Sequence, residues 1–77
     1  MKLTLYSTLD CHLCEQAASL FTQIIDTFEL EHIDIAGSEE LVEKYGIRIP
    51  VVKSESGNEL GWPFDLEMLQ LFIHENR

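Results

Sequence analysis

Two cysteines, Cys11 and Cys14, are the residues of this 77-residue chain whose type and spacing most clearly indicate chemistry. A disulfide between them would close too short a loop to remove much entropy from the unfolded chain, so it would add little stability. In a reducing compartment, cysteines this close more often exchange disulfides or bind a metal. The pair therefore predicts either redox chemistry or part of a metal site.

The residues around the pair change from the periodicity of a strand to that of a helix. Leu3 and Leu5 alternate with other side chains, which predicts a strand over residues 2–6. After the cysteines, apolar residues recur every three or four positions, which predicts a helix of about four turns. These residues are Leu13, Ala17, Leu20, Phe21, Ile24, Ile25 and Phe28.

The remaining segments predict a strand at 31–35, a short helix between Ser38 and Gly46, a hairpin of strands 51–54 and 59–60, and a helix that begins at Asp65. Ser38 and Asp65 suit N-caps, and Gly46 suits a left-handed C-terminal cap. A helical crossover makes the first two strands parallel. We therefore predict one α/β domain over residues 1–77, a β-α-β-α-β-β-α sandwich whose mixed four-stranded sheet has helices on both faces.

The position of the pair between strand and helix gives each sulfur a different role. Cys11 lies at the helix N-terminus, where unpaired N–H groups and the positive end of the helix dipole favour a thiolate. Cys14 is one turn further on, so it can reach and resolve a mixed disulfide formed by Cys11. Because C-x-x-C beside a β-α-β unit is a typical redox motif, we predict that Cys11 is the nucleophile and Cys14 the resolving thiol.

Three ionisable neighbours of the pair act in opposite directions. A protonated His12 would lower the pKa of the Cys11 thiol, whereas a neutral His12 would only be an exposed turn residue. The carboxylates of Asp10 and Glu15 oppose a further negative charge on sulfur. Each also has a structural alternative, because Asp10 could cap the helix and Glu15 could complement its dipole. We expect the pKa of Cys11 to be lowered only moderately, which suits a reductant better than a strong oxidant.

Two alternatives do not use the cysteines as a redox pair within one chain. They could be unreactive core residues, because free cysteine packs well in protein interiors, or they could bridge two chains through a shared metal. A zinc site within one chain needs further ligands, and the histidines form no second closely spaced pair. These are His12, His32 and His74. We therefore expect a monomer with no metal site.

The composition excludes several classes of partner. Fourteen acidic residues against five basic ones give a net charge of −9, which repels nucleic acids and anionic membranes. The chain opens without a charged leader and contains no apolar stretch long enough to span a membrane. We expect a cytoplasmic protein that binds neither nucleic acids nor membranes.

The chain resembles the thioredoxin-like superfamily, and within it the short bacterial glutaredoxin-like proteins. The resemblance rests on the C-x-x-C segment, on the segment from Leu3 to Cys14 as a whole, on Ile49-Pro50 before the third strand, and on the segment from Glu59 to Asp65. It implies that Pro50 is cis and lies beside Cys11, so that the Ile49 backbone pairs with an extended substrate.

Two further residues are candidates for contact with a substrate. His12 lies between the cysteines, and Trp62 could form an apolar platform near them for a partner protein. The alternative for Trp62 is core packing against the last helix, which is the commoner role of a large aromatic side chain. The predicted substrate-binding residues are therefore His12, Ile49, Pro50 and Trp62.

The resemblance also raises glutathione as a cosubstrate. Glutaredoxins that use glutathione usually carry a basic residue shortly before the first cysteine, where this chain has the segment from Ser7 to Asp10. They commonly have Gly-Gly where this chain has Gly61-Trp62. Glutathione is therefore possible but doubtful, and the chemistry requires no cofactor.

These residues together predict a thiol-disulfide oxidoreductase. Its substrate would be a protein or small-molecule disulfide, and an unknown reductant would regenerate the dithiol. The main alternative is a binding or redox-sensing module without catalytic activity, because a fold does not by itself determine a function.

Overall fold

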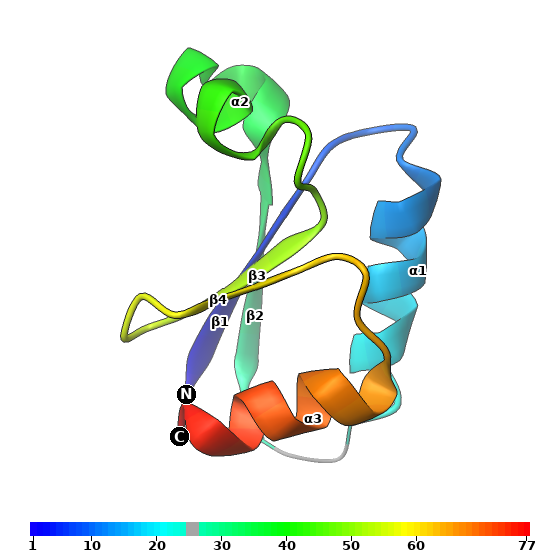
Figure 1. The fold of residues 1–77 in the computed structure, drawn as a ribbon, viewed down its shortest axis with the longest axis vertical. Helices are drawn as coiled ribbons and strands as arrows, with labels where there is room; N and C mark the ends of the chain where they lie inside the picture. The colour runs from blue at the N-terminus through cyan, green and yellow to red at the C-terminus, as the bar shows by residue number, and fades with distance from the viewer. Residues whose placement is uncertain (25–26) are drawn as a thin grey trace.

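The computed structural model describes residues 1–24 and 27–77 (Figure 1). The predicted β-α-β-α-β-β-α order is confirmed, with one short 3-10 helix, η1, after the second strand. The elements are β1 (Lys2–Ser7), α1 (His12–Phe21), β2 (Glu29–Asp34), η1 (Ile35–Gly37), α2 (Glu39–Tyr45), β3 (Val51–Ser54), β4 (Glu59–Gly61) and α3 (Leu66–Glu75).

The four strands form one mixed sheet in the order β2-β1-β3-β4. The central strand β1 is parallel to β2, as the helical crossover between them requires. It is antiparallel to β3, which continues into β4 through a hairpin. Leu5 has His32 of β2 on one side and Val52 of β3 on the other. Gly57, at the tip of the hairpin, has a positive φ of 96° that favours glycine.

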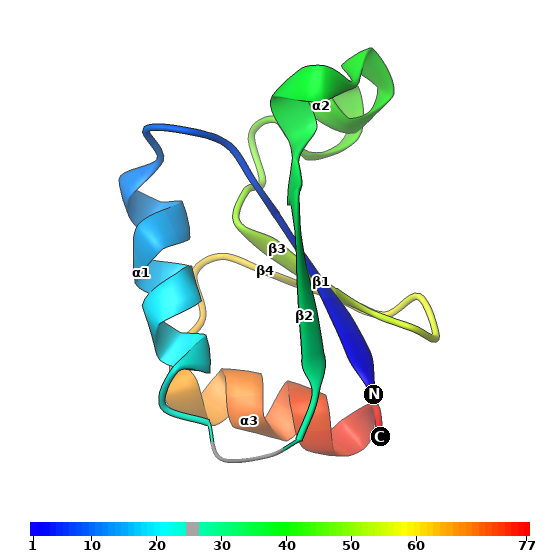
Figure 2. The same ribbon diagram turned by 180° about the vertical axis from the view of Figure 1, so that it is seen from behind.

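Alternation along the strands divides the core between the two faces of the sheet. The face covered by α1 and α3 buries Leu3, Leu5 and Val52 together with apolar side chains of both helices. The opposite face buries Tyr6 and Val51 against a smaller cluster that includes Tyr45 of α2. Figures 1 and 2 show α1 and α3 packed together beside the sheet, with α2 at the end away from α3. The prediction of helices on both faces is confirmed.

Helix α1 is shorter than its apolar pattern predicted. It ends at Phe21, where the Thr22 hydroxyl donates to the Ser19 carbonyl at 2.7 Å and the backbone turns. Phe28 still packs against the core, with its ring centroid 5.8 Å from that of Phe21, but it does so from outside the helix. The pattern therefore predicted too long a helix, and it also predicted burial for Leu13, which is exposed. Ile25, also assigned to the stripe, lies outside the described residues.

The predicted caps of the two later helices are confirmed, but the left-handed cap is wrong. Ser38 accepts a hydrogen bond from the Leu41 N–H and Asp65 accepts one from the Met68 N–H. Gly46 is right-handed, with φ −50° and ψ −38°. A side chain there would collide with the carbonyl oxygen of Val42, so glycine is needed for close approach. In the described part of the chain, no helix is long and apolar enough to cross a membrane.

Candidate active site

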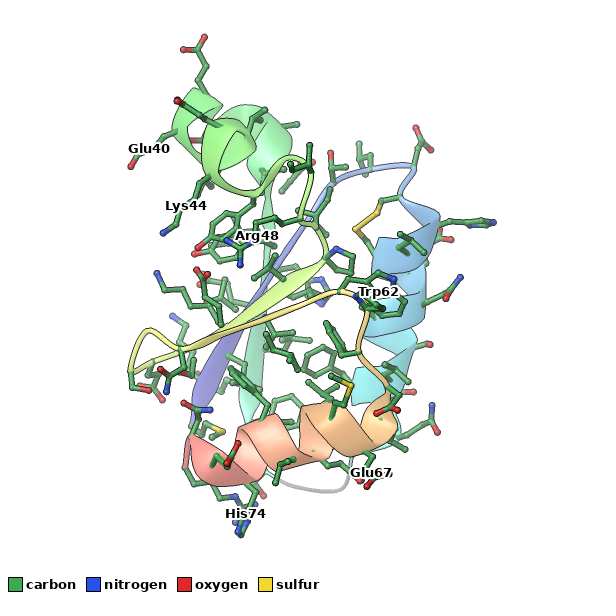
Figure 3. All side chains as sticks on the ribbon, in the orientation of Figure 1. Glu40, Lys44, Arg48, Trp62, Glu67 and His74 are labelled. Atoms are coloured by element: carbon green, nitrogen blue, oxygen red, sulfur yellow. A yellow bond between two sulfur atoms is a disulfide. The ribbon has the colours of Figure 1, made fainter. Side chains whose placement is uncertain are left out.

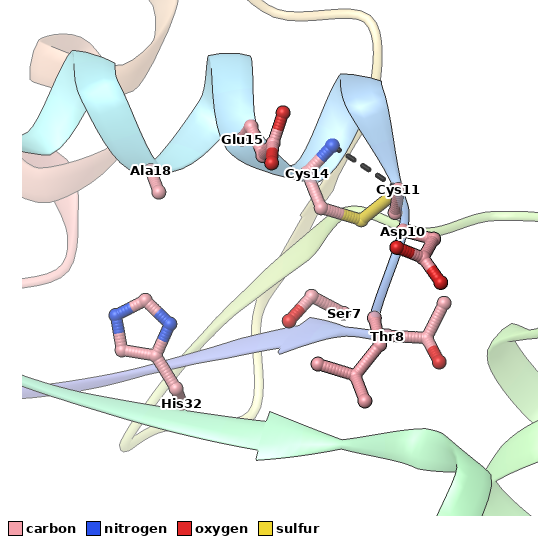
Figure 4. Close-up of a pocket in the computed structure, with 9 residues that line it drawn as sticks. Ser7, Thr8, Asp10, Cys11, Cys14, Glu15, Ala18 and His32 are labelled. Atoms are coloured by element: carbon pink, nitrogen blue, oxygen red, sulfur yellow. Dashed lines mark hydrogen bonds between the residues drawn. A yellow bond between two sulfur atoms is a disulfide. The ribbon is translucent and has the colours of Figure 1, made fainter.

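The two cysteines form a disulfide at the start of α1, with their Cα atoms 5.2 Å apart. Cys11 is the N-cap of the helix, and its Sγ accepts a hydrogen bond from the Cys14 N–H at 3.2 Å (Figure 4). The first helical hydrogen bond runs from the Glu15 N–H to the Cys11 carbonyl. Cys14 is only 5% exposed, whereas Cys11 is half-buried. The two sulfurs therefore differ both in accessibility and in their relation to the helix.

Asp10 does not cap α1, which corrects one of the two roles considered for it. Cys11 holds the capping position, and Asp10 precedes it in the left-handed region with φ 57°. Aspartate tolerates this conformation better than most residues because its short polar side chain can interact locally. The Asp10 side chain is exposed and makes no hydrogen bond or ion pair with any described residue. Its carboxylate is therefore open to solvent beside the reactive pair.

A pocket of about 220 Å³ opens beside the disulfide, between α1 and the ends of β1 and β2 (Figure 4). Both cysteines contribute to its wall, together with side chains from the loop before α1, from α1 itself and from β2. The lining residues are Ser7, Thr8, Leu9, Asp10, Cys11, Cys14, Glu15, Ala18 and His32. A small molecule or a side chain in this space would touch the sulfurs directly.

The ionisable side chains in the wall of this pocket are two carboxylates and the imidazole of His32. Asp10 and Glu15 line it, and neither lysine nor arginine does. The only ion-pair partner of Glu15 among the described residues is His12, whose Nδ1 lies 3.3 Å from Glu15 Oε2. The His12 side chain is 93% exposed, and it does not line the pocket. His12 consequently faces solvent next to the pair and gives the pocket no fixed positive charge.

His32 is the lining residue that the sequence reasoning had not assigned to the site. It lies in β2 opposite Leu5 of β1, on the side of the sheet that α1 covers, and it shares the pocket with Ala18. The signal was present in the sequence, because the crossover predicts parallel pairing of the two strands. The sequence did not give the register of this pairing. The observed strand β2 begins at Glu29, two residues before the predicted strand.

The Ile49–Pro50 peptide bond is cis, and both residues lie in the loop just before β3, outside the pocket wall. Val51, the residue after Pro50, pairs with Tyr6 near the end of β1 that leads into the cysteine loop. Pro50 is buried, and its carbonyl accepts a hydrogen bond from the Trp62 N–H at 3.0 Å. The proline is therefore held at the same end of the sheet as the disulfide.

Comparison with known proteins agrees with this arrangement. A family model described as "Glutaredoxin-like domain (DUF836)" matches residues 2–74. The chain belongs to the glutaredoxin-like domain family. No match was found among curated proteins. The Cys11–Cys14 pair of this glutaredoxin-like chain fits a redox-active C-x-x-C thiol module.

Solved structures are similar to this chain over most of its length, which agrees with the match to the family model. The chain is similar to the target protein XcR50 from X. campestris, whose X-ray structure has a TM-score of 0.87 and 37% identity, covering 97% of this chain and 99% of that one. The solution structure of XcR50 has the same TM-score and identity, with coverage of 100% and 97%. Protein Ne2328 from Nitrosomonas europaea has a TM-score of 0.71 and 35% identity, covering 92% and 88%.

Trp62 of this glutaredoxin-like chain is half-buried and packs against the larger core cluster. Its ring meets that of Phe64 edge to face, with centroids 5.0 Å apart, and Figure 3 labels it in the segment between β4 and α3. The Trp62–Pro63 bond is also cis. Trp62 does not line the pocket. Of the predicted site residues, the structure thus brings Cys11 and Cys14 together, while His12, Ile49, Pro50 and Trp62 do not line the pocket.

On the opposite face of the sheet, Tyr45, Glu59 and Arg48 form a second polar cluster, here called the Tyr45 network. The Tyr45 hydroxyl donates to Glu59 at 2.5 Å and the Arg48 guanidinium donates to the same carboxylate at 3.2 Å. The Tyr45 ring stacks on Tyr6 with centroids 4.4 Å apart. Burial first, and then its hydrogen bond to Glu59, raise the pKa of Tyr45 well above its usual range. The bond from Tyr45, followed by Arg48, holds the pKa of Glu59 below its usual range.

The Tyr45 network is connected to the loop before β3. The N–H groups of Arg48 and Ile49 both donate to the Tyr45 carbonyl, at 2.8 and 3.0 Å. The Ile49 N–H therefore already has an acceptor within the chain. Among the described residues, no group of three or more His, Cys, Asp or Glu side chains is arranged to hold a metal ion.

Proposed function

We propose that this protein is a thiol-disulfide oxidoreductase in which Cys11 attacks the substrate and Cys14 resolves the intermediate. The observation that carries the proposal is the asymmetry of the two sulfurs. Cys11 is the more accessible, and its Sγ accepts an N–H at the positive end of α1, an environment that stabilises a thiolate. Cys14 is buried one turn away, where it meets few partners other than Cys11.

The reaction begins from the reduced dithiol. The Cys11 thiolate attacks one sulfur of a substrate disulfide, forms a mixed disulfide with it and releases the other half as a thiolate that takes up a proton. The Cys14 thiolate then attacks Cys11 Sγ and releases the second half of the substrate. The substrate disulfide gains two electrons and two protons and becomes two thiols, while Cys11 and Cys14 become the disulfide seen here. An external dithiol returns the pair to its reduced form.

Pro50 and Ile49 form the proposed contact surface for an extended substrate. In support, Pro50 directly precedes Val51, which pairs with Tyr6 near the end of β1 that leads into the cysteine loop. The Ile49 N–H is bonded to Tyr45, so the Ile49 carbonyl is the group that would pair with a substrate backbone. We also propose that Trp62 supports Pro50 through its backbone and that His12 contacts the solvent side of the substrate.

No cofactor is needed for this exchange, and a reducing compartment such as the cytoplasm would suit it. The acidic pocket wall argues against glutathione, a tripeptide with two carboxylates, as the preferred partner. A protein or a small disulfide is the better candidate, and any dithiol of suitable potential could serve as reductant.

Two matched variants test the roles of the sulfurs. The reduced Cys14→Ser protein should form a stable mixed disulfide with hydroxyethyl disulfide, visible as a mass increase, because its nucleophile remains and its resolving thiol is absent. The reduced Cys11→Ser protein should form the adduct at least about tenfold more slowly, since its remaining thiol is buried. Both variants should fail to turn over.

Redox titration of the unaltered protein completes the test. A reversible two-electron transition between dithiol and disulfide should appear in a series of thiol buffers. Equal labelling of the two variants would contradict the assigned roles. Failure of the pair to oxidise under mild conditions would favour a binding module that retains the fold without the chemistry.

A further inference from the structure

We infer that the pocket beside the disulfide selects substrates that carry a positive charge close to the reacting sulfur. The preferred class would be aminothiol disulfides and polypeptide cysteines next to lysine or arginine. This inference rests on the proposed function, because it concerns the group that is bound while Cys11 forms a mixed disulfide. It adds a substrate class that neither the family match nor the solved structures specify.

The first step is the chemistry of the pocket wall. The Asp10 and Glu15 carboxylates line the space that the two sulfurs also line. Asp10 has no partner among the described residues, and Glu15 has only the exposed His12. Ser7 and Thr8 add hydroxyl groups, which can accept hydrogen bonds from an ammonium or guanidinium group. A substrate half attached to Cys11 would therefore meet acceptors and negative charge on this side.

The second step is the position of the lysine and arginine residues, none of which lies in the pocket wall with the Asp10 and Glu15 carboxylates. Lys2 pairs with Glu31, while Lys44 and Arg48 lie over the Tyr45 ring on the other face of the sheet. Figure 3 shows Lys44 and Arg48 near α2, away from α1. None of the five basic residues lines the pocket; they are Lys2, Lys44, Arg48, Lys53 and Arg77. The local field therefore has the same sign as the net charge of −9.

The third step is size. At about 220 Å³ the pocket is smaller than a typical pocket for a drug-sized ligand, which begins near about 300 Å³. One amino acid side chain or one half of a short disulfide suits this space better than a whole tripeptide does. Because the disulfide itself forms part of the wall, the positive group would lie within a few bonds of the reacting sulfur.

The test compares three small disulfides that differ mainly in charge. These are cystamine, which carries ammonium groups, the neutral hydroxyethyl disulfide, and the anionic dithiodipropionate. Rates of oxidation of the reduced protein are measured at low ionic strength and divided by the rates with dithiothreitol, which corrects for the intrinsic reactivity of each disulfide. The charge preference is the corrected rate for cystamine over that for dithiodipropionate, and we expect a value of about tenfold or more.

A double variant and a matched control locate the source of that preference. Asp10→Asn with Glu15→Gln should reduce the charge preference by about three- to tenfold, because two nearby carboxylates are neutralised. Glu67→Gln removes one charge from the exposed start of α3, at the opposite end of the molecule from the disulfide (Figure 3). It should change the preference by less than about twofold. Because the preference is a ratio within one protein, altered Cys11 reactivity cancels.

The possible outcomes distinguish failure of the charge-preference inference from failure of the proposed oxidoreductase function. A preference near one in the unaltered protein, or one that the double variant retains, overturns the inference and leaves the oxidoreductase intact. An equal loss in Glu67→Gln overturns it as well, because the effect would then come from net charge alone. If none of the three disulfides oxidises the pair, the proposed function fails and the inference fails with it.

Discussion

The disulfide pocket and the Tyr45 network lie on opposite faces of one sheet and use carboxylates in contrasting ways. Glu59 in the network accepts hydrogen bonds from Tyr45 and Arg48, and its side chain is mostly covered. Asp10 and Glu15 at the pocket are exposed, and only Glu15 has a partner, an exposed histidine. In the Tyr45 network, hydrogen bonds from within the protein compensate the carboxylate charge, and this contributes to stability. In the disulfide pocket, the carboxylates remain free to interact with a ligand, as expected of a binding surface.

The largest expected effect is on the network side. Tyr45 is 1% exposed and stacks on Tyr6, so Tyr45→Ala removes a large buried ring along with its hydroxyl. We expect the free energy of unfolding to fall by about 3–5 kcal/mol, measured by denaturant titration. For a domain of this size, that loss would leave much of the protein unfolded. A loss below about 1 kcal/mol would show that this face of the sheet is not tightly packed.

A smaller effect isolates the hydrogen bond from the packing. Tyr45→Phe keeps the ring and removes the donor to Glu59, and it should cost about 1–3 kcal/mol because the acceptor is charged. Tyr6→Phe is the matched control, since the Tyr6 hydroxyl has no hydrogen-bond partner among the described residues. Equal losses in the two variants would contradict the special role of the network.

The network also predicts how stability depends on pH. The pKa of Glu59 is lowered in the folded state, so its contribution is present above the ordinary value of 4.5 and is lost as pH falls through the lower folded-state value. The pKa of Tyr45 is raised, so its contribution is present at neutral pH and is lost as pH rises above the ordinary value of 10.0. Denaturant titrations should show a shallower loss of stability at acid pH in Glu59→Gln than in the unaltered protein.

The smallest effect on stability is expected at the pocket. Asp10→Asn should change the free energy of unfolding by less than about 0.5 kcal/mol, because the side chain is exposed and has no partner among the described residues. Asparagine also tolerates the left-handed backbone of residue 10. A loss above about 1 kcal/mol would make Asp10 a structural residue and would erase the contrast between the two regions.

Local patterns predicted the elements that local forces determine. The order of helices and strands along the chain follows from residues close together in the sequence, as do the Ser38 and Asp65 caps and the position of Cys11 at the start of a helix. The end of α1 did not, because Phe28 supplies an apolar residue in helical phase while packing from a loop. Periodicity identifies candidates for burial, of which Leu13 proved exposed, and it does not show how the backbone reaches the core.

The parts of the site that were missed depend on contacts between distant segments. His32 reaches the pocket only through the register of β1 with β2. Tyr45 and Glu59 come from α2 and β4, fourteen positions apart, and no motif links them. The capping role considered for Asp10 was wrong for a different reason, because Cys11 is the N-cap and its sulfur accepts the Cys14 N–H.

The capping of α1 by Cys11 connects redox state to helix folding. The sulfur that would exchange with substrate is also the acceptor for the Cys14 amide, so every change in its bonding alters the strength of a hydrogen bond at the first turn. A thiolate is a stronger acceptor than a disulfide sulfur. Reduction should therefore slow hydrogen exchange of the Cys14 amide relative to amides later in α1. The exchange rate at the first turn of the helix would then report the redox state of the Cys11–Cys14 pair.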